Sequence, residues 1–190
     1  DAAVTEAIEA CERAAEVLRG RPDNVGAAAI LADAVALAER ALHRPPPARL
    51  VCALAQATLA CGSLTHARGH FDRAAELARA EADVIVLAQA ALGLGGVWLN
   101  EHRSSVDRQR VLDLQRLAVS RLAEKETPLA ARLTMRLAAE AVYDGAPAEP
   151  VWDALALVRT LGDDAALAEA LSLTHHALLA PEHAACRLEL

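Results

Sequence analysis

Apolar residues recur at three- and four-residue spacing along nearly the whole chain, and short runs of turn-forming residues interrupt them. This spacing places apolar side chains on one face of a helix. The interruptions, such as "GRPDN" at 20–24, "RPPP" at 44–47 and "LGDD" at 161–164, are typical of helix ends and turns. The pattern predicts nine helices, over residues 2–19, 26–43, 48–61, 64–82, 83–99, 106–122, 128–142, 147–161 and 163–179.

Helix-terminal residues agree with these boundaries. Thr127 precedes Pro128, an order that is typical of an N-cap followed by proline in the first turn. Gly162 stands where a left-handed residue closes one helix, directly before the capping candidates Asp163 and Asp164.

Composition narrows the fold class. The 190 residues include 47 alanines, while aromatic residues make up 2% of the chain. Alanine is the strongest helix former, and the alternating β-branched and aromatic runs of strands are scarce. Because short loops join the predicted helices, antiparallel neighbours are the expected packing. We expect an all-α protein of about nine helices, arranged as antiparallel pairs.

Charge and hydropathy argue against two classes of partner. The net charge is −7, and the 19 basic residues are spread along the chain, which predicts no direct contact with nucleic acid. The longest weakly polar stretch, residues 84–99, is too short for a membrane span and contains three glycines. No cleavable apolar segment opens the sequence, so we expect a cytoplasmic protein without a membrane partner.

The four cysteines lack the C-x-x-C spacing of redox and zinc sites. Cys11, Cys52 and Cys61 lie within apolar helical stripes, where a free thiol packs as a small apolar group. We expect packing roles for these three side chains.

One helix pair has a more specific pattern. The stretch "GSLTHARGHFDRAAELARA" at 62–80 places a glycine, small residues and the chain's single phenylalanine at the offsets of a tetratricopeptide repeat. With residues 48–61 as its first helix, this pair resembles one such repeat over residues 48–81. The resemblance implies that Leu54, Gly62, Ala67, Phe71 and Ala74 pack the hairpin. It also implies that residues 1–190 form a single repeat domain, a right-handed α–α superhelix.

A second resemblance covers residues 91–190, through "ALGLGGVWLNEHR" at 91–103, "LTMRLAAEAVYDG" at 133–145 and "LGDDAALAEALSLTHHALLAPEH" at 161–183. This text is similar to the helical region of large actinobacterial signal-transducing ATPases and LuxR-type transcriptional regulators. The resemblance implies a sensory or scaffold segment attached to ATPase and DNA-binding domains. Because the chain begins at Asp1 without an initiator methionine, we expect it to be a fragment of a larger multidomain protein.

The glycines of "LGLGG" at 92–96 match no phosphate-binding spacing and follow no predicted strand, so we expect them to thin and end a central helix. The polar and aromatic residues beyond them are the best candidates for contacts with a protein segment or small effector: Trp98, Asn100, Glu101, His102 and Arg103. Glu101 and His102 also suggest an acid and base pair. Adjacent helical residues point apart, however, so we expect no catalytic residue.

Histidines and arginines supply the remaining candidate chemistry. His66 and His70 share a helix face that we expect to face solvent, and no third metal ligand accompanies them. His175, His176, Glu182 and His183 gather near the last helix, but neighbouring histidines on a helix diverge. We therefore expect no metal site and no cofactor. Arg108, Arg110 and Arg116 fit a solvated helix face, and a groove for an acidic peptide stays open as an alternative.

Together these patterns predict a non-enzymatic helical-repeat module of an intracellular transcriptional regulator, which binds a protein segment or small effector and signals to attached domains. Two alternatives stay open. One is a helical metal-dependent enzyme that uses His102, His175, His176 and His183 with Glu101. The other is a structural dimerisation module, in which the partner is a second copy of the chain.

Overall fold

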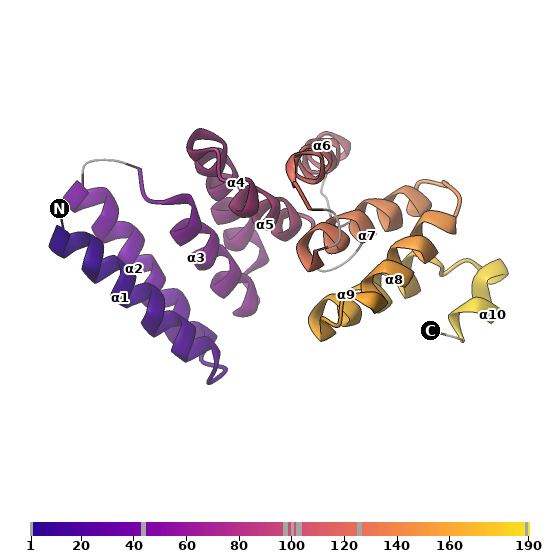
Figure 1. Ribbon diagram of the computed structural model, residues 1–190, viewed down its shortest axis with the longest axis horizontal. Helices are drawn as coiled ribbons and strands as arrows, with labels where there is room; N and C mark the ends of the chain where they lie inside the picture. The colour runs from indigo at the N-terminus through magenta and orange to yellow at the C-terminus, as the bar shows by residue number, and fades with distance from the viewer. Residues whose placement is uncertain are drawn as a thin grey trace. The chain divides into compact units, whose positions relative to one another are not determined.

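The computed structural model describes residues 2–42, 45–96, 99, 101, 104–124, 127–188 and 190, and these residues form helices and no strand (Figure 1). The predicted all-α class is therefore confirmed. The longer helices are α1 (Ala2–Arg19), α2 (Asn24–Leu42), α3 (Ala48–Ala60), α4 (Leu64–Glu81), α5 (Val84–Leu94), α6 (Ser105–Arg121), α7 (Pro128–Tyr143), α8 (Glu149–Thr160) and α9 (Asp164–Ala177). A 3-10 turn, η1 (Pro181–His183), and a short helix, α10 (Ala184–Arg187), follow them.

The chain divides into two compact units, which we call unit 1 (Asp1–Leu94) and unit 2 (Gly95–Leu190). In unit 1 each helix packs on the next along the chain, and α3 also contacts α5. In unit 2, α7 contacts α6, α8 and α9, and α8 contacts α9. Helices that follow one another thus pack in pairs. Each unit also has one contact between the first helices of two pairs, namely α3 with α5 in unit 1 and α7 with α9 in unit 2. The continuous superhelix over residues 1–190 stays a prediction.

The core of unit 1 is built mainly from small side chains. Alanines face the neighbouring helix at each contact and are fully or almost fully buried: Ala27, Ala34 and Ala38 in α2, Ala55 and Ala57 in α3, and Ala67, Ala74 and Ala78 in α4. Small side chains allow two helix axes to approach closely. Phe71 is the single aromatic residue of unit 1, and it is 2% exposed.

Unit 2 has larger side chains in its core. One cluster joins Leu99, Met135, Val151, Leu155 and Leu173 with the alanines of α7 and α9, and Trp152 packs on its edge. The side chains of α7 supply its centre, because Leu133 and Met135 are fully buried. Helix α7 is therefore the element around which unit 2 is assembled.

Side-chain caps fix several helix starts as the sequence predicts. The hydroxyl of Thr127 accepts from the amide of Ala130 at 3.3 Å, and Pro128 occupies the first turn of α7. Gly162 has a left-handed φ of 66°, and the carboxylate of Asp163 then accepts from the amide of Ala166 at 2.7 Å. These caps satisfy amides that the first turn of a helix leaves without a backbone partner.

The structure differs most from the sequence pattern at the end of the fifth helix and beyond the ninth. The fifth helix was expected to reach Leu99, but α5 ends at Leu94 because Gly96 takes a left-handed φ of 77°. Leu99 is nevertheless buried in unit 2, so its apolar character reflects core packing outside a helix. The short α10 lies beyond the last predicted helix and was not expected.

The cysteines differ in how far their side chains are buried. Cys52 is buried, as expected, and Cys11 is half-buried. The packing role expected for Cys61 is wrong, because this residue follows the last turn of α3 and is exposed. Among the described residues, no helix has the length and apolar character that crossing a bilayer would require.

Candidate functional site

The hairpin of α3 and α4 contains the residues that resemble a tetratricopeptide repeat. Leu54 of α3 and Ala67 and Ala74 of α4 are buried, and these two helices pack on each other. Gly62 lies in the turn between the helices with a φ of 81°, a conformation that glycine adopts without a steric cost.

The ring of Phe71 lies directly against the backbone of α5. A Cβ atom built on Gly93 would lie 2.3 Å from Cζ of Phe71, which is far inside van der Waals contact. Only glycine therefore fits at position 93 while the ring stays in place. The close helix contact that the sequence suggested for the glycines of this segment is present at Gly93.

Side chains of α3 and α5 form one surface, which we call the first-helix face: Arg49, Gln56, Ile85 and Gln89. The amide of Gln56 donates to Sγ of Cys52 at 3.9 Å, and the thiol of Cys52 donates to Oε1 of Gln89 at 3.9 Å. Arg49 lies seven residues before Gln56, and Ile85 lies four residues before Gln89. Both spacings keep a pair on one side of its helix.

Electrostatics extend this face to α1. Nε of Arg49 lies 3.2 Å from Oε1 of Glu12, and this hydrogen bond and charge raise the pKa of Arg49. Burial raises the pKa of Cys52 to about 12, and the charge of Asp83 adds to the effect. The thiol therefore stays protonated at neutral pH and keeps its donor role between the two glutamines.

The predicted contact cluster is described only at one position. Glu101 is half-buried in the segment between α5 and α6. Trp98, Asn100, His102 and Arg103 lie outside the described residues. The negative charge of Glu101 acts to raise the pKa of Arg136, so Glu101 belongs electrostatically to the network around that arginine.

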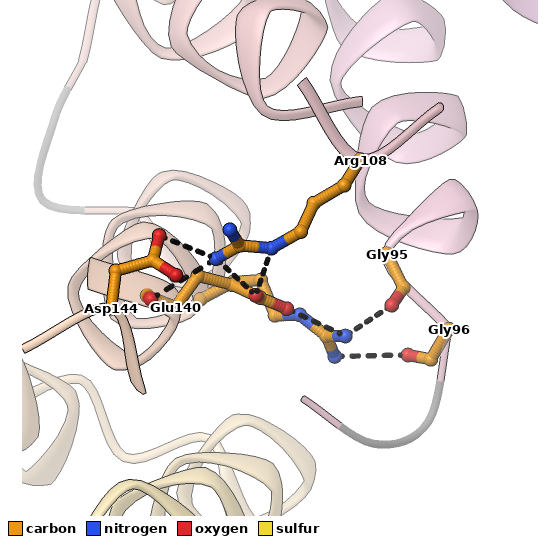
Figure 2. A network of polar contacts seen from close by, with 6 residues as sticks. Gly95, Gly96, Arg108, Glu140 and Asp144 are labelled. Carbon is orange, nitrogen blue, oxygen red and sulfur yellow. Dashed lines mark hydrogen bonds and ion pairs between the residues drawn. The ribbon is translucent and has the colours of Figure 1, made fainter. Parts of the chain in front are cut away.

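A buried polar network occupies unit 2 (Figure 2). Arg136 and Glu140, one turn apart on α7, are 1% and 2% exposed. The guanidinium of Arg136 donates to the carbonyl oxygens of Gly95 and Gly96, the latter at 3.0 Å. Its Nη2 also lies 3.5 Å from Oε1 of Glu140. The first two residues of unit 2 are thus bound to the middle of α7.

Arg108 of α6 completes the network from the other side. Its Nε and Nη2 donate to Oε2 of Glu140 at 3.3 and 3.1 Å (Figure 2). The same Nη2 lies 2.7 Å from Oδ2 of Asp144. Each carboxylate oxygen of Glu140 therefore faces a different arginine, and Glu140 joins α6 to the glycine segment through Arg136.

The pKa values of the two arginines shift in opposite directions. Burial lowers the pKa of Arg136, and the charges of Glu140, Glu169 and Glu101 oppose that effect. Hydrogen bonds to Asp144 and Glu140 raise the pKa of Arg108 in spite of its partial burial. Guanidinium groups stay charged across the physiological range. The two arginines therefore carry permanent charges, which suits them to hold backbone and helices in place.

The sequence reasoning missed this network. Arg136 and Glu140 are four residues apart on a helix, a spacing that more often marks an exposed pair. Arg108 was expected on a solvated face or in a groove for an acidic peptide, but its charge is directed to Glu140 and Asp144. Arg116 does lie on a solvated face, 2.9 Å from Asp113. The only signal in the sequence is that "TMRLAAE" at 134–140 places Arg136 beside the apolar stripe of α7.

The described histidines of unit 1 are His66 and His70. His66 is exposed, and its Nδ1 lies 2.8 Å from the hydroxyl of Ser63. His70 is half-buried, and burial lowers its pKa, with smaller effects from Arg73 and His66.

The rings of His175 and His176 stand edge to face with centroids 5.8 Å apart, closer than the divergence expected for neighbours on a helix. Among the described residues, no group of three or more histidine, cysteine, aspartate or glutamate side chains is arranged to hold a metal ion.

Comparison with models of protein families gives no match, and a search of curated proteins finds no relative. The tetratricopeptide and LuxR-type resemblances therefore stay predictions.

Proposed function

We propose that this chain is a helical-repeat interaction module of an intracellular transcriptional regulator, and that it binds a protein segment without catalysis of its own. The observation that carries the proposal is the first-helix face. Its side chains come from α3 and α5, and Gln56 and Gln89 among them are joined through Cys52 by hydrogen bonds. The face also includes an apolar residue, Ile85, that is 54% exposed.

The extent of this face favours a protein segment over a small effector. Neighbouring helices lie about 8–10 Å apart, so contacts on α1, α3 and α5 together span roughly 20 Å. A peptide has a backbone long enough to cross three helices, and it offers donors and acceptors at each one. The two glutamines provide both kinds of group.

The cation of this face already has an anionic partner. Arg49 is paired with Glu12, while Gln56 and Gln89 are neutral. We therefore expect the partner to be held by amide hydrogen bonds and by apolar contact at Ile85. Because salt screens exposed charges but hardly affects apolar contact, binding should depend only weakly on ionic strength.

The binding would act on attached domains through populations of conformers. A partner that binds one arrangement of the helices more tightly shifts the protein toward that arrangement. In this proposal the responding elements are the ATPase and DNA-binding domains of the full-length regulator in the cytoplasm. The module itself would need no cofactor and no metal.

A photo-crosslinking experiment tests the location of the partner. The photoreactive amino acid p-benzoylphenylalanine replaces Ile85 in the full-length protein, and Val25 in a matched control, because both are exposed aliphatic residues of unit 1. Crosslinks to one partner protein or to one domain of the regulator should form at position 85 and not at position 25. Equal yields at both positions, or none at 85, would contradict the proposal.

Affinity measurements with the purified partner give the second readout. Ile85→Lys should weaken binding by about tenfold or more, since burying a large apolar side chain is worth about 1.5–3 kcal/mol. Val25→Lys should leave the affinity unchanged. Equal affinities for the two variants would place the site elsewhere.

A further inference from the structure

Two glutamine amides of the first-helix face meet at one sulfur atom. Nε2 of Gln56 donates to Sγ of Cys52, and the thiol of Cys52 donates to Oε1 of Gln89, each at 3.9 Å. Cys52 is 1% exposed, whereas both glutamines are half-buried. The thiol therefore lies beneath the two amides and joins α3 to α5 within unit 1.

A protonated thiol requires opposite orientations of two amides that bond to it. It carries a single proton, so it donates to one amide, and the second amide bonds to the sulfur only as a donor. Burial raises the pKa of Cys52 to about 12, which keeps this proton in place at neutral pH. Gln89 accordingly turns its oxygen to the sulfur, while Gln56 turns its nitrogen there.

The remaining polar atom of each amide is thereby fixed as well. Gln56 keeps Oε1 as an acceptor, and Gln89 keeps Nε2 as a donor. Neither of these two atoms has a further hydrogen bond to a residue that the structure describes. The two helices thus present one acceptor, on α3, and one donor, on α5, both attached to amides that bond to the same buried sulfur.

We propose that Cys52 is a positioning residue for partner binding, and that Gln56 and Gln89 together bind an adjacent N–H and C=O of the partner. The N–H donates to Gln56, and the C=O accepts from Gln89. This inference rests on the proposed function, because it concerns the partner of the same first-helix face.

Two parts of a protein segment provide such an adjacent pair of groups. One is the backbone of an extended residue, whose N–H and C=O point to the same side. The other is the primary amide of an asparagine or glutamine side chain. The backbone of a helical segment provides no such pair, because its groups are bonded within the helix.

NMR spectroscopy of the unbound protein tests the orientation of the two amides. Nuclear Overhauser effects from the Hβ protons of Cys52 should be stronger to the side-chain amide protons of Gln56 than to those of Gln89. The reason is that only the nitrogen of Gln56 bonds to the sulfur. Gln56→Ala and Gln89→Ala assign the signals. Equal effects at both glutamines, or a stronger effect at Gln89, overturn the proposal.

Binding measurements test the pair itself, and the probe is a synthetic peptide of the partner segment that crosslinks at position 85. Gln89→Glu still accepts from the thiol but offers the partner an acceptor in place of the donor. The affinity should therefore fall by about tenfold or more. The matched control is Gln109→Glu, the same change at an exposed position of α6 in unit 2, which should bind as the parent does.

Variants of Cys52 test its positioning role. Cys52→Ala should weaken binding of the same peptide by about threefold or more, because the amides lose the bonds that orient them. Cys52→Ser keeps a donor and an acceptor and should recover most of that affinity. Packing alone predicts no such recovery, since a hydroxyl is a poorer apolar group than a methyl. Equal losses in the two variants overturn the positioning role.

Changes in the peptide distinguish the two sources of the N–H and C=O. If the backbone is bound, N-methylation of one peptide nitrogen should abolish binding, and replacing asparagine or glutamine side chains by alanine should not. If a primary amide is bound, the alanine replacement should abolish binding instead. Loss of binding in neither series overturns the proposal.

The outcomes separate this inference from the proposed function. A peptide that crosslinks at position 85 but binds Gln89→Glu as tightly as the parent overturns the inference and leaves the proposed function standing. The absence of any crosslink at position 85 contradicts the proposed function, and this inference is then overturned with it.

Discussion

The two units reach compact helical packing with different core chemistry. The buried polar or charged side chains among the described residues are Gln115, Arg136, Glu140 and Thr174, and all four belong to unit 2. The described core of unit 1 is apolar, and in it the ring of Phe71 lies close against the backbone of Gly93. The packing of unit 1 is therefore specified by the shapes of its side chains, whereas that of unit 2 is specified partly by charge.

This difference has a thermodynamic consequence. The stability of an apolar core changes when the volume of a buried side chain changes. The loss in free energy of unfolding depends on how well the neighbouring side chains adjust. A buried ion network responds to the loss of one member, because the remaining charges stay in a medium of low polarity. Removal of one charged side chain from the core should therefore destabilise unit 2. The described core of unit 1 holds no such side chain, so its stability should respond to changes of side-chain volume instead.

The largest effect should follow from breaking the network of unit 2. Glu140→Ala leaves Arg136 buried without its adjacent carboxylate, and it removes a partner of Arg108. Loss of one member of a buried pair typically costs about 3–5 kcal/mol. Urea unfolding should show this loss, whereas Asp113→Ala, which removes an exposed partner of Arg116, should cost about 0–1 kcal/mol. Similar losses in both variants would show that the buried network of unit 2 contributes no more to stability than an exposed ion pair does.

A smaller effect is expected from adding a methyl group at Gly93, where the ring of Phe71 lies against the backbone of α5. Gly93→Ala forces a methyl group against Phe71, and overpacking of this kind costs about 1–3 kcal/mol. The control is Gly69→Ala on α4, where an added Cβ meets nothing within 4 Å. That change should stabilise the helix by about 0.5–1 kcal/mol. A Phe71→Leu background should reduce the penalty at position 93, and an unchanged penalty would assign the strain to another contact.

Cys52 gives unit 1 a dependence on alkaline pH. Burial raises the pKa of this thiol from 9.0 in its unperturbed form to about 12, so the folded state holds a proton that the unfolded state releases. The stabilisation is complete below about pH 9 and is lost as the pH rises toward 12. Over the first pH unit above 9 the loss should be on the order of 1 kcal/mol.

Cys52→Ala lacks this titrating group, so its free energy of unfolding should fall less steeply with pH than that of the parent. Cys61→Ala, at an exposed thiol, should keep the parent slope. Parallel curves for the parent and Cys52→Ala would show that the thiol does not contribute.

The smallest effect concerns the end of α4. Ala82 takes a left-handed φ of 57° at the C-cap, where a Cβ atom is unfavourable. Ala82→Gly should therefore stabilise unit 1 by about 0.5–1 kcal/mol, whereas Ala80→Gly, two residues earlier and within the helix, should destabilise it by a similar amount. Thermal unfolding of the two variants checks the opposite signs.

The sequence predicted helices well because their signals are local. Periodic apolar residues, Thr127 with Pro128, and Gly162 with Asp163 each act within one or two turns. The end of α5 was misplaced because Leu99 is apolar for a tertiary reason, namely its burial in the core of unit 2. Local periodicity does not distinguish an apolar residue that continues a helix from one that is buried outside a helix by tertiary packing.

The polar network could not be predicted from local sequence signals either, because its partners are brought together by the tertiary fold. Arg136 meets carbonyl groups that lie 40 and 41 residues away in the chain, and the pattern of α7 does not encode those partners. The candidate cluster at 98–103 was chosen for its residue types, and of these the structure describes Glu101, which acts on Arg136. The residue types expected of a contact site thus pointed to a segment next to this network, without revealing Arg136.

The aromatic residues of the two units also differ in a way that gives unit 2 its own spectroscopic signal. Unit 1 contains Phe71 and no tyrosine or tryptophan, whereas Tyr143 and both tryptophans belong to unit 2. Intrinsic tryptophan emission therefore monitors unit 2 alone, while far-ultraviolet circular dichroism monitors the helices of both units. Overlaying the two melting curves of the unlabelled protein shows directly whether the units unfold together or in succession.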